Sequence, residues 1–91
     1  MNIAVIDDVP QDLHTIENAL CSYYQERQMD THIFPFSGSD AFWKDYSVGK
    51  YDLIFLDIYI DQITGMDIAS RLRELGDSSA LIFVTSSDSF A

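Results

Sequence analysis

Four short apolar runs, separated by segments of helical character, limit most strongly what this chain can fold into. The runs are solid rather than alternating between apolar and polar residues, a pattern typical of strands in a parallel sheet, and the run at 53–56 should be buried on both faces. Strands of this kind that alternate with helices favour an α/β fold, a parallel sheet with helices on both faces. The predicted strands are residues 2–6, 32–36, 52–56 and 80–84.

The segment after the first strand has the spacing of an amphipathic helix. Pro10 lies at its start, where a missing amide donor costs little. A shorter helix is predicted around "SDAFWKDY", after the second strand. The predicted inner face of the first helix comprises Leu13, Ile16, Leu20 and Tyr23.

A third helix is predicted to begin at a capping box formed by Thr64 and Asp67. It should end at Gly76, because glycine readily adopts the left-handed conformation of a helix C-cap. Its predicted apolar face comprises Ile68, Leu72 and Leu75.

The second predicted strand contains Pro35, which has no amide hydrogen and is therefore confined to a sheet edge. Among doubly wound sheets, the strand order 2-1-3-4-5 places strand 2 at an edge and strands 1 and 3 side by side. Ligands of such sheets bind at the carboxyl ends of the strands, where the winding reverses. The sequence therefore predicts a site between the ends of strands 1 and 3.

Acidic residues stand at both of these ends. Asp7 and Asp8 follow the first strand, and Asp57 follows the third. Three carboxylates brought this close together favour a shared cation, and hard oxygen ligands suit Mg²⁺. Asp57 is placed to attack a phosphoryl group as a carboxylate nucleophile, while the hydroxyl of Thr85, after the fourth strand, can bond a phosphoryl oxygen.

These acids, the loop leading to Gly65 and the hydroxyl after the fourth strand together resemble a CheY-like receiver domain of a two-component response regulator. The resemblance implies a flavodoxin-like fold in which Asp57 is the phosphoacceptor for a sensor histidine kinase. It also implies that Asp7, Asp8 and the backbone carbonyl of Tyr59 organise Mg²⁺, and that Thr85 is the switch hydroxyl. The domain would act in signalling rather than as an enzyme.

The resemblance also bears on what surrounds this domain. The loop "DIYIDQITG" lacks the Met-Pro common among receivers and is similar to loops of regulators with LytTR-type DNA-binding output domains. Receivers have a fifth strand that ends in a Lys and a fifth helix, which residues 1–91 do not include. We therefore expect an incomplete receiver domain over 1–91, with its output domain absent. Lys44 and Lys50 lie on or beside the second helix and do not match the missing Lys.

Composition excludes several classes of partner. A formal charge of −10 repels nucleic acids and anionic lipids alike. Cys21 is the single cysteine, and no apolar stretch approaches the roughly 20 residues needed to span a bilayer. The amino terminus shows no export signal, so the expected compartment is the cytoplasm.

Simpler explanations remain open for the featured residues. Asp8 can cap the first helix, Asp57 can be a turn acid, and Thr85 can satisfy the backbone at a strand end. Asp61 can be a solvated loop acid, or it can influence the site by contacting the residues that bind the metal. The residues assigned to structural or packing roles are His14, His32, Cys21, Tyr23, Phe42 and Trp43.

Two rival functions are also open. A phosphohydrolase that forms an aspartyl phosphate usually has a second acid two residues after its nucleophile, where this chain has Tyr59. A pseudo-receiver would keep the fold as an interaction module without phosphorylation.

The strand at 80–84 has no proline or charge, and with no fifth strand it becomes an open sheet edge. A homodimer or strand-exchanged dimer is the expectation for the isolated segment.

Overall fold

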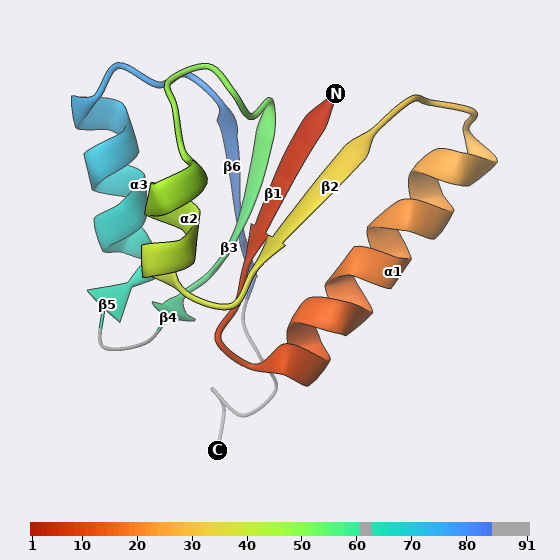
Figure 1. Cartoon of the computed structure of the whole chain (residues 1–91), viewed down its shortest axis with the longest axis horizontal. Coiled ribbons are helices and arrows are strands. Elements are labelled where there is room, and N and C mark those ends of the chain that lie inside the picture. The colour runs from red at the N-terminus through yellow and green to blue at the C-terminus, as the bar shows by residue number, and fades with distance from the viewer. Residues whose placement is uncertain (61–62, 85–91) are drawn as a thin grey trace.

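The computed structural model describes residues 1–60 and 63–84, with the side chains of 59–60 and 63–64 excepted. Within these ranges it contains a four-stranded parallel sheet in the order β2-β1-β3-β6 (Figure 1). The predicted order of the first four strands is confirmed. The strands are β1 (Asn2–Ile6), β2 (His32–Phe36), β3 (Leu53–Asp57) and β6 (Ala80–Val84).

Pro35 lies in β2, at the edge of the sheet and in register with Val5 of β1. Proline has no amide hydrogen and cannot donate a hydrogen bond to a neighbouring strand, so it is tolerated in an edge strand, where that donor can point away from the sheet. β1 and β3 are left side by side at the centre, which brings their carboxyl ends together.

Helices lie on both faces of the sheet (Figure 1). α1 (Pro10–Glu26) packs against β2 and β1, and α2 (Ser39–Asp45) and α3 (Gly65–Glu74) lie on the opposite side. The main core forms on the side of α2 and α3, where alternate strand residues face apolar helix positions. Its buried members are Ala4, Ile6, Phe42, Tyr51, Ile54, Leu56, Ile68 and Leu72.

The predicted inner face of α1 is wrong at its last position. Leu13, Ile16 and Leu20 are partly buried, but Tyr23 is 48% exposed and Tyr24 is partly buried in its place. Both i+3 and i+4 neighbours of Leu20 lie near one helix face, and the packing against the sheet edge selects the i+4 residue. The Tyr23 ring instead lies under the guanidinium of Arg27, 3.6 Å from its ring centroid.

α3 ends one residue earlier than its apolar pattern suggests, because Leu75 lies beyond Glu74 and is 45% exposed. The predicted left-handed cap at Gly76 is confirmed, with φ at 81°. The amide of Gly76 donates to the carbonyl of Arg73 at 3.1 Å, and the amide of Asp77 donates to that of Leu72 at 3.0 Å. This pair of bonds is a Schellman motif, which satisfies carbonyls that the helix end leaves open.

Between β3 and α3, the chain forms a two-stranded antiparallel ribbon that the apolar pattern did not predict. Its strands are β4 (Tyr59–Ile60) and β5 (Ile63–Thr64), paired Tyr59 to Thr64 and Ile60 to Ile63. Thr64 thus belongs to β5, and the capping role predicted for its side chain lies outside the described residues. Within 1–60 and 63–84, no helix has the length and apolar character needed to cross a bilayer.

Candidate metal centre

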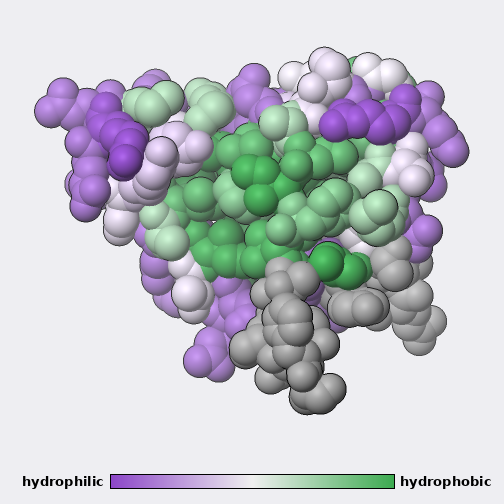
Figure 2. Space-filling view, turned by 180° about the vertical axis from the view of Figure 1, so that it is seen from behind, coloured by the Kyte–Doolittle hydropathy of each residue, from purple (hydrophilic) through white to green (hydrophobic). Residues whose placement is uncertain are grey.

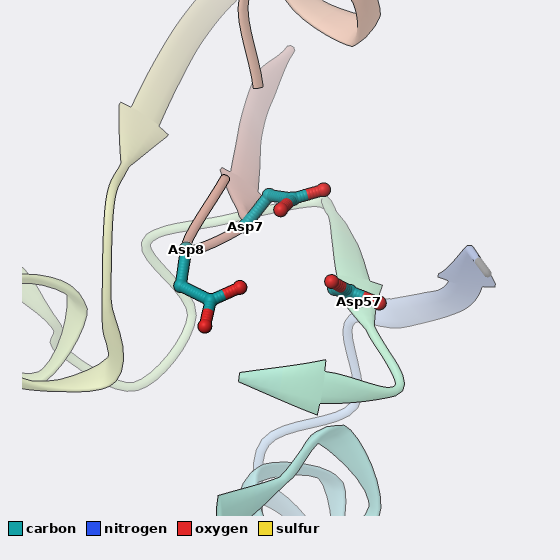
Figure 3. Close-up of side chains that lie close together, drawn as sticks. All are labelled: Asp7, Asp8 and Asp57. Carbon is teal, nitrogen blue, oxygen red and sulfur yellow. The ribbon is translucent and has the colours of Figure 1, made fainter. Parts of the chain in front are cut away.

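Three acidic side chains meet at the carboxyl end of the sheet. Asp7 and Asp8 follow β1, and Asp57 is the last residue of the neighbouring β3. Each side chain offers a carboxylate oxygen that lies within 4.8 Å of the other two. Figure 3 shows the three carboxylates around one space, although Asp57 is 50 positions from Asp7 in the sequence. The predicted convergence is confirmed by this geometry.

Backbone hydrogen bonds hold the first of these acids in place. The amide of Asp7 donates to the carbonyl of Phe36 at 3.1 Å, which extends the pairing of β1 with β2. The amide of Val9 then donates to the Oδ1 atom of Asp7 at 2.9 Å, which turns the chain toward α1. Val9 is the N-cap residue of α1, so the alternative that Asp8 caps this helix is wrong.

The environment of Asp7 disfavours its charged form. Its side chain is 2% exposed, and burial raises the pKa from an ordinary value of 3.8 to about 6. The hydrogen bond from Val9 opposes this rise, while the nearby negative charges of Asp57, Asp12 and Asp8 add to it. A bound cation would relieve both the burial penalty and the repulsion between carboxylates.

The donor set matches the chemistry of a hard divalent cation. Asp7 and Asp57 are buried and Asp8 is exposed, so the space has two buried ligands and one toward solvent. Mg²⁺ is usually held by one or two carboxylates while it keeps several waters, which this open arrangement allows. The residues present therefore fit Mg²⁺.

The other predicted site residues are not tested in the same way. Tyr59 begins β4, two residues beyond Asp57, and the ligand role of its carbonyl stays a prediction. Thr85 and Asp61 lie outside the described residues. Lys50 bonds the carboxylate of Asp45 at 2.7 Å, before β3 begins and therefore at the opposite end of the sheet from the acids.

Sequence reasoning missed the backbone contacts around Ile58, the residue after Asp57. Its amide donates to the carbonyl of Val84 at 3.2 Å, and its carbonyl accepts from the amide of Gly65 at 2.6 Å. These bonds fix the end of β3 between β6 and α3. No side-chain pattern signals them, because any residue type can make a backbone hydrogen bond.

Two curated proteins match about half of the chain. The transcriptional regulatory protein PcoR of Escherichia coli is 43% identical over 42 residues, which cover 46% of this chain and 19% of PcoR. The sensory transduction protein LytR of Staphylococcus saprophyticus is 39% identical over 41 residues, which cover 45% of this chain and 16% of LytR. Each alignment spans less than a fifth of the longer relative, and the LytTR-type subgroup stays a prediction.

Solved structures agree in fold. The response regulator protein TrrA of Thermotoga maritima, crystallised in complex with Mg²⁺-BeF, superposes with a TM-score of 0.77 at 24% identity, covering 98% of this chain and 72% of that chain. The family model described as "Response regulator receiver domain" matches residues 3–91. The chain therefore belongs to the response regulator receiver domain family.

Proposed function

We propose that this domain accepts a phosphoryl group on Asp57 in a reaction that depends on Mg²⁺. One observation carries the proposal. Asp57 is the last residue of a central strand, and one of its carboxylate oxygens lies within 4.8 Å of a carboxylate oxygen of Asp7 and of one of Asp8. Its side chain is only 5% exposed, so a phosphoryl donor must approach along the open side of the site near Asp8. Membership of the receiver family supports the same role.

Asp57 would act as the nucleophile. One of its carboxylate oxygens forms a bond to phosphorus as the bond between phosphorus and the donor's leaving group breaks, which gives an aspartyl phosphate. Asp7, Asp8 and Asp57, with the backbone carbonyl of Tyr59, would hold Mg²⁺. When bound, Mg²⁺ supplies positive charge against the phosphoryl oxygens. The Mg²⁺-BeF complex of TrrA supports this assignment.

The proposed partners follow from the same role. The phosphoryl donor is a sensor histidine kinase. The domain that responds to the phosphorylated state is a DNA-binding output domain outside residues 1–91. Phosphorylated Asp57 would attract the hydroxyl of Thr85 and bias the domain between two conformations. PcoR, a transcriptional regulatory protein, supports transcription as the output.

We also propose that the isolated segment self-associates through β6. Among the described residues β6 is the last strand of the sheet, so one side of it offers unpaired backbone groups. Viewed from behind, an apolar surface fills the middle of the molecule (Figure 2), and Ile82 and Phe83 of β6 are 41% and 38% exposed.

Sedimentation at high concentration tests this association. Dimers or larger species are expected for the wild-type segment, and Ile82→Lys should return it to a monomer, because a charge on an edge strand opposes pairing. Val48→Lys is the matched control, since Val48 is exposed but lies outside the sheet. A wild-type segment that stays monomeric would exclude the association.

Intact mass after incubation with Mg²⁺ and acetyl phosphate tests the phosphoacceptor role. A gain of one phosphoryl group is expected, and it should disappear without Mg²⁺ and in Asp57→Asn. Circular dichroism shows whether both proteins are folded. A folded wild-type chain that gains no phosphoryl group would overturn the proposal for this segment and favour a pseudo-receiver.

A further inference from the structure

Gly65 differs from Gly49 and Gly76 in the reason why its position requires glycine. Gly49 and Gly76 have φ of 81° and open space where a Cβ would be, so they serve the backbone conformation. Gly65 has no such φ. A Cβ on Gly65 would come within 3.0 Å of the carbonyl oxygen of Asp57, 3.3 Å from its carbonyl carbon and 3.5 Å from the Cα of Ile58. Gly65 is therefore needed for space, directly against the backbone of Asp57.

This close approach is part of a hydrogen-bonded arrangement. The amide of Gly65 donates to the carbonyl of Ile58 at 2.6 Å, while the amide of Ile58 donates to Val84 on the other side at 3.2 Å. The ribbon of β4 and β5 returns the chain so that the first residue of α3 lies against the end of β3. The atoms in conflict are backbone atoms, so rotation of a side chain cannot relieve the contact.

We propose that Gly65 is a positioning residue for Asp57. The missing Cβ lets the start of α3 close on the Asp57–Ile58 peptide, which holds the Asp57 carboxylate beside Asp7 and Asp8. Any larger residue at position 65 pushes the end of β3 away from α3 and opens the group of carboxylates. The effect on phosphoryl transfer rests on the proposed function, whereas the effect on the position of Asp57 does not.

The test compares Gly65→Ala with Gly76→Ala in the same segment. Gly76→Ala is the matched control, because it strains a helix cap at the far end of α3 without touching the site. In Gly65→Ala, the backbone amide resonances of Asp57 and Ile58 should shift in ¹H–¹⁵N spectra. Mg²⁺ affinity should fall about 10- to 100-fold, the range found for groups that orient metal ligands. Gly76→Ala should lower thermal stability and leave Mg²⁺ affinity and these resonances unchanged.

A folded Gly65→Ala protein with unmoved Asp57 and Ile58 resonances and wild-type Mg²⁺ affinity would overturn the proposal. If that variant does not fold, amide exchange in the wild type provides the second measurement. Mg²⁺ should slow exchange at Ile58 and Gly65 more than at Gly76, and equal changes at all three would also overturn it. A wild type that binds Mg²⁺ but gains no phosphoryl group would remove the proposed function alone.

Discussion

Asp7 and Asp77 are two buried carboxylates at opposite ends of the sheet, with side chains 2% and 3% exposed. Burial raises the pKa of both groups, yet the net directions differ: the pKa of Asp7 is raised to about 6, and that of Asp77 is lowered below 3.8. The amount of burial therefore does not separate the two acids. Their hydrogen-bond donors and charged neighbours do.

Asp77 lies between α3 and β6, against the segment that joins α2 to β3, and it accepts several hydrogen bonds. The hydroxyl of Tyr46 donates to it at 2.5 Å, the amide of Ser79 at 2.8 Å and the amide of Gly49 at 3.4 Å. These bonds favour the charged form enough to outweigh burial. Asp77 thus ties α3 to the segment between α2 and β3, a structural role.

Asp7 accepts a hydrogen bond from Val9, but its other close neighbours include the carboxylates of Asp8 and Asp57. Here like charges add to the burial penalty instead of offsetting it. The comparison teaches that hydrogen-bond donors around a buried acid favour its charged form, whereas neighbouring carboxylates disfavour it, a repulsion that a bound cation would relieve.

The largest expected effect comes from removing the donor-bound acid. Asp77→Ala should lower the free energy of unfolding by about 2–4 kcal/mol, because it leaves the Tyr46 hydroxyl and buried amides without their acceptor. Urea unfolding followed by circular dichroism measures this loss. Asp7→Ala is the matched substitution and should cost less than about 1 kcal/mol, since it also removes a repelled charge. Equal losses in the two variants would break the comparison.

The second prediction concerns pH. The folded chain binds the Asp7 proton more tightly than the unfolded chain does, so this group makes the free energy of unfolding fall as pH rises from 3.8 to about 6. Asp7→Asn removes that decline and should stabilise the fold at pH 7 by about 1–3 kcal/mol.

Urea unfolding of Asp7→Asn and wild type at pH 4, 6 and 7.5, without divalent cations, measures the difference between the two curves. Carboxylates that do not interact with Asp7 titrate alike in both proteins and cancel in this difference. A gap that stays constant across the pH range would mean that Asp7 has an ordinary pKa.

The smallest expected effect is stabilisation by the cation itself. At a concentration ten times its dissociation constant, Mg²⁺ should stabilise the wild type by about 1.4 kcal/mol. The gain should be larger at pH 7.5 than at pH 5, because protons compete for Asp7 at the lower pH. Thermal unfolding with and without Mg²⁺ measures it. Asp45→Asn, at the opposite end of the sheet, should keep the full gain, and a gain retained by Asp57→Asn would place the cation elsewhere.

The sequence alone determined the parallel sheet, its strand order and the three acids at its carboxyl end. Solid apolar runs that alternate with helices favour a parallel sheet, Pro35 is tolerated only in an edge strand, and the carboxyl ends of parallel strands lie at the same edge of the sheet. These constraints act within one strand or between neighbouring strands, so they can be inferred from residue types alone.

The tertiary structure decided which buried acid is structural, which tyrosine of α1 packs inward and why position 65 is glycine. Asp77 shows no signal of this role in the sequence, because two of its donors, Tyr46 and Gly49, come from the distant segment between α2 and β3. Gly65 likewise depends on the backbone of Asp57, which the ribbon of β4 and β5 brings against it. Such contacts arise only when distant backbone segments meet, and residue type and spacing do not encode those distances.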